Sequence, residues 1–486
     1  MPNTLTQGSP WRAILAFSIP LVLGNMVQQG YQLADTVVVG RFVGVLPLAA
    51  VGATGVLVWL ITGFSWGMTA GLAIPIAQAY GAKDEAAVRR SVGVGAWISL
   101  GLTVILTLIG TLLIRHLLTL LRTPAELMDD AATFGFISFL FMVAVIAFNY
   151  LSVILRAVGD SRTPLYFLAV SAALNIVLDF VLIGALRMGV AGAGFATAAA
   201  QTVSALLCLW WISRRFPIFH LSRDDWRVTR EQLSHHLGLG VPLGFQASIT
   251  ALGGVAVQIR LNTLGSESVA AFTTASRVDG LAVTFLIGME VAVSTYVAQN
   301  WGARDLARVR AGVSQAFRMV ITEAVILGIL LVLANRPLVH LSIGDADPTV
   351  VDLSAHAVEL WALTYWILGV LFVARGALQG LGRMRAPFWS GSVELVLRVL
   401  AAVWLGGIIG FMGVAAASPL AWAGAVALLL PSYLRVRSRL LDDDALAAAQ
   451  ARPGPVVRRR PRLPGRGRAR RGGRAGRGQR ARRLDG

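Results

Sequence analysis

The stretch "GLAIPIAQAYGAKDEAAVRR" (residues 71–90) recurs later in the chain as "EVAVSTYVAQNWGARDLARVR" (residues 290–310). At an offset of 221 residues, five polar or small residues fall at matching positions: Gln78, Gly81, Ala82, Asp84 and Arg89 match Gln299, Gly302, Ala303, Asp305 and Arg310. Further along, "LRAVGDSRTP" (155–164) matches "LQGLGRMRAP" (378–387) at an offset of 223. Similarity at a nearly fixed offset indicates a duplicated architecture.

The composition indicates a membrane protein with many spans. Of the 486 residues, 56% are hydrophobic and 14% are charged, and the mean hydropathy is +0.68. A soluble domain typically has about 25% charged residues, and apolar runs of roughly 18 or more residues indicate membrane-spanning helices. Cys208 is the only cysteine, so no internal disulfide is expected.

Twelve segments are predicted to span the membrane. We expect an all-α integral membrane fold with two six-helix lobes, related by a pseudo-two-fold axis along the membrane normal. Parallel repeats of this kind tend to place substrate sites between the two halves. The predicted spans are 13–39, 46–76, 92–120, 130–155, 164–185, 189–213, 238–263, 268–298, 311–334, 354–380, 387–409 and 412–434.

The lobes are expected at 1–213 and 237–438, joined by a cytoplasmic linker at 214–236 and followed by a disordered Arg/Gly/Pro-rich tail at 439–486. Residues 451–486 contain 14 arginines and one aspartate, so they hold most of the net charge of +18. Such a tail would contact anionic lipids, and it lacks the aromatic residues that stack on bases. No nucleic-acid partner is expected.

Basic residues collect in alternate loops, which predicts the orientation. By the positive-inside rule, both termini are expected to be cytoplasmic, in a protein of the cell (inner or plasma) membrane. The basic loops carry Lys83, Arg89, Arg90, Arg156, Arg162, Arg214, Arg215, Arg223, Arg227, Arg230, Arg304, Arg308, Arg310, Arg383 and Arg385, whereas the alternate loops carry Arg41, Arg122, Arg187 and Arg336.

An ordered set of motifs resembles the multidrug and toxic compound extrusion (MATE) transporters over about residues 10–438. It begins with "IPLVLGNMVQQGYQLADTVVVGRFVGVLPLAAVG" (19–52) and continues with "AQAYGAKD", "LRAVGDSRTP", "GVPLGFQ" (240–246), "AAFTTASRV" (270–278) and "AQNWGARD". The resemblance implies a twelve-helix antiporter that exports small molecules by alternating access. We expect a monomer in the lipid bilayer with a small-molecule substrate.

The repeat breaks where the first half carries intramembrane acids. Asp35 maps to Ala256 at the offset of 221, and Asn175 and Asp179 map to Arg398 and Ala402 at 223. Carboxylates inside a membrane are costly and are commonly functional. Asn175 and Asp179 are four residues apart and share a helix face, and Thr197 on the next span lies at a similar depth.

Two acids, an amide and a hydroxyl suit Na⁺, which as a hard cation prefers oxygen ligands. The acids could equally bind protons, because burial favours the neutral form of a carboxyl. No cofactor besides this coupling ion is expected. The resemblance implies the same cation site: Asp35, Asn175, Asp179 and Thr197 match a first-lobe, DinF-like pattern, whereas "GVPLGFQASITALGGVAVQ" (240–258) lacks the acid of the NorM-like branch.

Other interpretations of these residues stay open. Asp35 and Asp179 could reach the interface or pair with Arg41, and Thr197 could bond its own helix backbone. Asn149 is a further coupling candidate nearer the inner end of its span. The possible substrate cavity comprises Met26, Gln28, Tyr31 and Arg277. An intrahelical ion pair is expected for Glu394 and Arg398; the roles of Asp279 and Glu290 are left open.

Three functions compete at this stage. The favoured one is efflux of small organic molecules, cationic or amphiphilic, in exchange for Na⁺ or H⁺. A lipid-linked oligosaccharide flippase of the same superfamily would need a basic cavity, which the first half does not offer. A membrane enzyme such as a polyprenyl transferase needs clustered acids near a membrane face, and the only aspartate run, 442–444, follows the last span. We therefore expect no enzymatic activity.

Overall fold

The computed structural model describes residues 5–343 and 347–451, and these residues form helices with no strand. Unit 1, Met1–Asp444, contains the membrane-spanning helices, and unit 2 is Ala445–Gly486. The helices are α1 Pro10–Phe42, α2 Val45–Gly81, α3 Glu85–Leu120, η1 Ala125–Leu127, α4 Met128–Leu140, α5 Met142–Ala157, α6 Arg162–Asp179, η2 Phe180–Ala185, α7 Gly189–Arg215, η3 Pro217–Phe219, η4 Arg223–Trp226, α8 Arg230–Asn262, α9 Ser266–Gly302, α10 Leu306–Ile343, α11 Pro348–Gly380, α12 Arg385–Ile409, α13 Phe411–Ala415 and α14 Ala417–Ala451.

The all-α membrane fold with two lobes is confirmed. Eleven helices in the described residues are long and apolar enough to cross a membrane, and a twelfth span is formed if Ala125–Leu140 and Met142–Ala157 are counted together. That pair is bent by 45°. In lipid the backbone must satisfy its own hydrogen bonds, which is why the apolar segments form helices.

The boundary predicted for the tail is wrong. The predicted disordered tail begins at 439, whereas α14 continues to Ala451. Residues 440–451 are rich in leucine and alanine, which are strong helix formers. The arginine-rich remainder, 452–486, lies outside the described residues, so the disorder and lipid contact expected there stay predictions.

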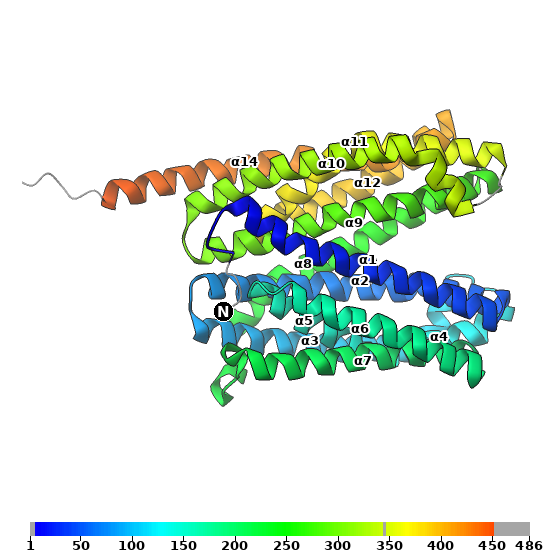
Figure 1. Ribbon diagram of the computed structural model, residues 1–486, viewed down its shortest axis with the longest axis horizontal. Helices are drawn as coiled ribbons and strands as arrows, with labels where there is room; N and C mark the ends of the chain where they lie inside the picture. Colours follow the sequence, from blue (N-terminus) through cyan, green and yellow to red (C-terminus); the bar gives the residue numbers. More distant parts are fainter. Residues whose placement is uncertain (1–4, 344–346, 452–486) are drawn as a thin grey trace, which may run out of the picture. The chain divides into compact units, whose positions relative to one another are not determined.

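Each lobe has its own apolar core, and Figure 1 shows α3–α7 in one bundle and α9–α12 in the other. Half of the first helix of each lobe packs into the apolar core of the other lobe. Ile14 and Phe17 of α1 are buried in the second-lobe core, while Leu239 and Leu243 of α8 are buried in the first-lobe core. The lobes are therefore interlocked and do not merely touch.

Glycines permit this exchange by letting backbones approach closely. A Cβ atom on Gly67 of α2 would overlap the carbonyl oxygen of Leu243 on α8, and one on Gly288 of α9 would lie 2.6 Å from Val22 on α1. Gly67 and Gly288 are repeat partners, and so are Val22 and Leu243 at the same offset of 221. The two crossings thus occupy equivalent positions in the repeat, but Gly67 meets the backbone of α8 whereas Gly288 meets the Val22 side chain of α1.

The linker is folded against the first lobe. Asp225 of η4 accepts hydrogen bonds from the backbone N–H and the hydroxyl of Ser222 (2.8 and 2.7 Å), and its carboxylate lies 3.6 Å from the Arg89 guanidinium. The Trp97 indole donates to the carbonyl of Trp226 at 3.3 Å. The bonds from Ser222 and the positive charge of Arg89 lower the pKa of Asp225.

We expect Asp225→Asn to loosen the linker. A lowered pKa means that the ionised form stabilises docking above the ordinary pKa of about 4 and that this stability is lost as pH falls through the folded value. The amide mimics the uncharged form at neutral pH. Trypsin should therefore cut at Arg223 or Arg227 several-fold faster than in the unsubstituted protein.

Asp224→Asn is the matched control, because Asp224 is exposed and forms only a surface pair with Arg227 at 3.2 Å. Equal cleavage rates in the Asp225 variant and this control would contradict the docking role.

Candidate functional site

Three helices of the first lobe bring the predicted acids and their polar neighbours together. Asp35 lies in the last third of α1, Asp179 is the final residue of α6, and Thr197 lies on α7. Directly after Asp179 the chain makes a π-helical turn, η2, a feature often found at functional sites. Asn175 and Asp179 are buried, with 3% and 0% of their surfaces exposed.

Helix α1 packs against α6, and the carboxyl groups of Asp35 and Asp179 lie close enough to influence each other. A hydrogen bond between them would need a proton on one of them, since ionised carboxylates only accept hydrogen bonds. If both carboxyl groups were ionised, they would repel each other, because the site holds little water to screen their charges. Among the described residues no ion pair joins either acid to a base, so the anticipated partner Arg41 does not fill this role.

Asn175 and Thr197 form the adjacent part of the cluster. The Asn175 amide donates to the Thr197 hydroxyl over 3.4 Å, a long hydrogen bond. Thr202, one turn later on α7, instead donates to the carbonyl of Ala198 at 2.7 Å. The Thr197 hydroxyl therefore faces the site, whereas the Thr202 hydroxyl bonds to the backbone of its own helix.

A narrow cleft runs beside these side chains. It contains about 160 Å³ of free space, but no part of it is wide enough for a water molecule. Two of its polar lining residues, Ser171 and Gln201, were missed by the sequence analysis. The signal was present, because Ser171 precedes Asn175 by four residues and Gln201 follows Thr197 by four. The cleft is lined by Tyr31, Ser171, Ala172, Asn175, Thr197, Ala200 and Gln201.

Several oxygens of the cluster have no hydrogen-bond partner within the described part of the chain. They are Oδ1 of Asp35, both carboxylate oxygens of Asp179, Oδ1 of Asn175 and Oε1 of Gln201. Buried polar atoms without partners are rare in folded proteins and call for an explanation. Oxygens of acids and amides are the donors that a hard cation takes, and the acids can also accept protons, so the residues present fit either coupling ion.

The remaining predicted residues lie apart from this cluster. Asn149 is half-buried on α5, eight residues before that helix ends, and it does not line the cleft. Met26 and Gln28 are exposed on α1, and Arg277 is exposed on α9 of the second lobe. Tyr31 alone of the predicted cavity residues lines the cleft, near Gln28, Gln201 and Asp35.

Three acids within the second lobe have partners, unlike Asp35 and Asp179 of the first, whereas Glu323 on α10 keeps one buried carboxylate oxygen without a partner among the described residues. The Glu394 carboxylate accepts from Arg398 at 2.7 Å, which confirms the predicted intrahelical pair, and from Arg375 at 3.0 Å. Asp279 accepts from the hydroxyl of Tyr365 at 2.7 Å. Glu290 accepts from Gln379 at 3.2 Å. Arg375, Tyr365 and Gln379 all lie on α11, which the sequence pattern did not single out.

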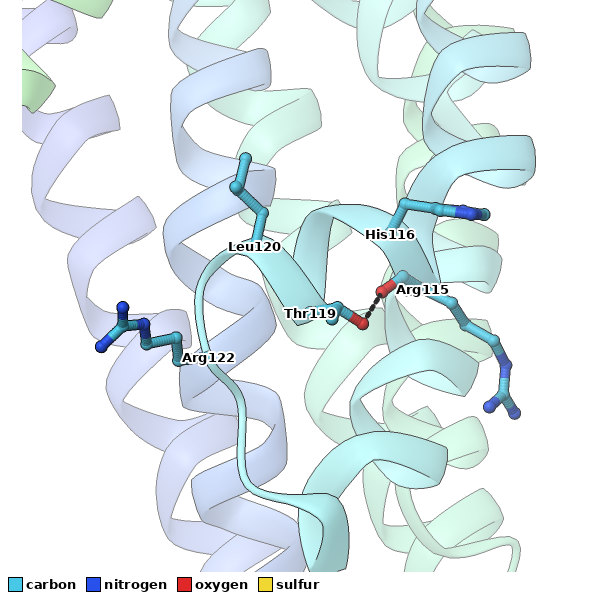
Figure 2. Close-up of a pocket in the computed structure, with 5 residues that line it drawn as sticks. All are labelled: Arg115, His116, Thr119, Leu120 and Arg122. Atoms are coloured by element: carbon cyan, nitrogen blue, oxygen red, sulfur yellow. Dashed lines mark hydrogen bonds between the residues drawn. The ribbon is translucent and has the colours of Figure 1, made fainter.

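A larger hollow lies at the C-terminal end of α3, and neither acid lines it. It has a volume of about 520 Å³ and is lined by Arg115, His116, Thr119, Leu120 and Arg122. Figure 2 shows the Arg115 and Arg122 side chains diverging, and the Thr119 hydroxyl donates to the Arg115 carbonyl at 2.8 Å. Because its polar groups do not converge, this hollow is not the candidate site.

Comparison with known proteins adds an independent line of support. The family model described as MatE matches residues 20–181 and 242–404. The probable multidrug resistance proteins YpnP and YoeA of Bacillus subtilis are each 28% identical, over 82% and 79% of this chain and 90% and 84% of theirs. A solved structure described as the outward-facing conformation of a multidrug resistance MATE family transporter has a TM-score of 0.84 at 23% identity, covering 90% of this chain and 98% of that one.

We expect Asp179→Asn to stabilise the protein in Na⁺-free buffer at pH 8. The substitution removes one of two facing buried acids that no base neutralises, so the free energy of unfolding should rise by about 1–3 kcal/mol. Thermal unfolding in detergent, followed by intrinsic fluorescence, measures this change.

Asp352→Asn is the control. Asp352 is half-exposed and pairs with Arg336 at 2.8 Å on the surface, so its loss should cost about 1 kcal/mol or less. A lower unfolding temperature for Asp179→Asn than for the unsubstituted protein would show that the carboxylate is stabilised by its surroundings.

Proposed function

The chain belongs to the MatE family, whose members are membrane transporters and not enzymes, and on that premise we propose that it is an ion-coupled antiporter that exports small organic molecules. The observation that carries the proposal is the facing pair Asp35 and Asp179, with partnerless oxygens beside it. With no nucleotide-binding motif in the sequence, an ion gradient is the driving force.

The first-lobe cluster is proposed as the coupling site, in keeping with the DinF-like pattern of its residues. Asp35 on α1 and Asp179 on α6 would take up Na⁺ or H⁺ from outside, which cancels their repulsion and pulls α1 towards α6. Pro20 inside α1 removes one backbone hydrogen bond, so this helix is suited to bending. Coupling then requires only that ion and substrate favour different conformations.

The orientation follows from the basic loops. The ends of the spans that carry the loops after Gly81, Ala157, Gly302 and Gly380 form one face of the molecule, here called the basic face. We propose that it is cytoplasmic, together with both chain termini. Asp35 and Asp179 then lie nearer the external face, where an inward-moving ion enters.

Substrates are proposed to be cationic or amphiphilic molecules of the kind that multidrug exporters take. An acidic pair without a neutralising base favours positive charge nearby, and the exposed Met26 and Gln28 of α1 offer adaptable contacts. A flippase for lipid-linked oligosaccharides is not favoured, because a pyrophosphate group would meet two acids at this site.

Transport should depend on both acids. Proteoliposomes that contain the protein would be tested for movement of ethidium, a fluorescent organic cation. The movement would be driven by an imposed Na⁺ gradient or by an imposed pH gradient. We expect one gradient to drive transport in the unsubstituted protein and in Asp352→Asn, and Asp35→Asn and Asp179→Asn each to slow it at least tenfold. Unchanged coupled transport in both variants would move the coupling site to Asp279 or Glu290.

The Thr197 hydroxyl discriminates between the two coupling ions. If Na⁺ couples, Thr197→Val removes one oxygen ligand, and the Na⁺ concentration for half-maximal thermal stabilisation should rise several-fold. Thr202→Val is the matched control, because that hydroxyl bonds only its own helix. An identical Na⁺ response in both variants would exclude the hydroxyl as a Na⁺ ligand, and the absence of any Na⁺ response in the unsubstituted protein would favour protons.

A further inference from the structure

The two copies of the repeated motif meet each other at the basic face. The Gln78 side chain of α2 donates to the carbonyl of Gly380 at the end of α11, at 2.9 Å. The Gln299 side chain of α9 donates to the carbonyl of Ala157 at the end of α5, at 2.8 Å. Gln78 and Gln299 are repeat partners, and so are Ala157 and Gly380. Each glutamine therefore reaches from its own lobe to the other lobe.

Two glycines make this arrangement possible. A Cβ atom on Gly81 would overlap the carbonyl oxygen of Gln299, and one on Gly302 would overlap the carbonyl oxygen of Gln78. Both glycines have ordinary negative φ angles, so alanine would fit the local backbone. Only the opposite lobe excludes a side chain at these two positions, and the ends of α2 and α9 are in backbone contact there.

One of the two glutamines also holds the start of the chain. Its Oε1 atom accepts from the backbone N–H of Leu5 at 3.1 Å, while the neighbouring Asn300 donates to the Leu5 carbonyl at 3.3 Å. Arg308 adds bonds to the carbonyls of Gln7 and Gly8. Leu5 itself is buried, with 4% of its surface exposed. Gln299 thus joins α5, α9 and the segment before α1.

We propose that Gln78, Gln299, Gly81 and Gly302 form a two-fold latch that seals the basic face, and that both glutamine bonds break when the transporter opens to that side. The contacts are between lobes, they are neutral, and they sit at the ends of the helices, where a rigid-body rotation of one lobe separates them. The proposal rests on the proposed function in one respect, which is that the two faces open in turn.

Spin labels placed beside the latch test it without substrate or ion. Cysteines at the exposed Ala82 and Ala303, in a Cys208→Ala background, carry the labels, and double electron–electron resonance gives their distance distribution. The unsubstituted latch should give one short distance. Gly81→Ala with Gly302→Ala should shift most of the population to longer distances, because each new Cβ atom wedges the lobes apart.

The glutamines are tested by Gln78→Met and Gln299→Met, which keep the side-chain length and remove the donor. The population at long distance should rise several-fold in each, and more for Gln299→Met, because this variant also frees the Leu5 N–H. Gly101→Ala, with open space around its position, and Gln258→Met, whose amide bonds only Asn262 of its own helix, should match the unsubstituted protein.

A short, unchanged distance in the double glutamine variant would overturn the latch, even if the glycine variants open or fail to fold. This readout is independent of ethidium transport. Loss of transport coupling with an intact latch response would reject the proposed function alone, and coupled transport with no latch response would reject the latch alone.

Discussion

The close approach of helices at paired glycines is the constraint on which the rest of this structure depends. Gly67 and Gly288 bring α2 onto α8 and α9 onto α1, and Gly81 and Gly302 bring the ends of α2 and α9 together. In lipid no hydrophobic force drives helices together, so tight packing at small residues supplies much of their association. These crossings interlock the lobes near the basic face.

The interlocking has an energetic consequence for transport. A typical neutral hydrogen bond contributes about 1 kcal/mol net, so the two glutamine bonds together bias the closed arrangement by only about 30-fold. That is enough to favour one conformation and too little to prevent the other. Differential binding of an ion or a substrate, worth a few kcal/mol, is of the size needed to reverse it.

Glu394 and Asp279 of the second lobe are held by partners, whereas Asp35 and Asp179 of the first lobe are not. In the second lobe Glu394 is held between Arg375 and Arg398, and Asp279 by the hydroxyl of Tyr365. Such paired groups are costly to disturb and suit a permanent framework. In the first lobe Asp35 and Asp179 lie close together with no base beside them, so their charge depends on the proton or cation that they bind. This asymmetry between two lobes built on the same repeat is what makes the first lobe the candidate for coupling.

The sequence by itself determined the class and the duplication, and it predicted the two acids and the Asn175 and Thr197 side chains of the candidate site. Apolar runs require helices in lipid, the offset of 221 residues reveals two lobes, and the four-residue spacing of Asn175 and Asp179 puts them on one face. Only the tertiary structure decided that half of α1 and half of α8 pack into the opposite lobe, and that the linker docks on α3. It also decided that Gln201 and Ser171 line the cleft while Asn149 and Arg277 do not. Finally, it decided that Gln78 and Gln299 each bond to a carbonyl of the opposite lobe. The physical reason is that periodicity specifies which face of a helix is apolar, whereas the partner of that face depends on how closely two backbones can approach.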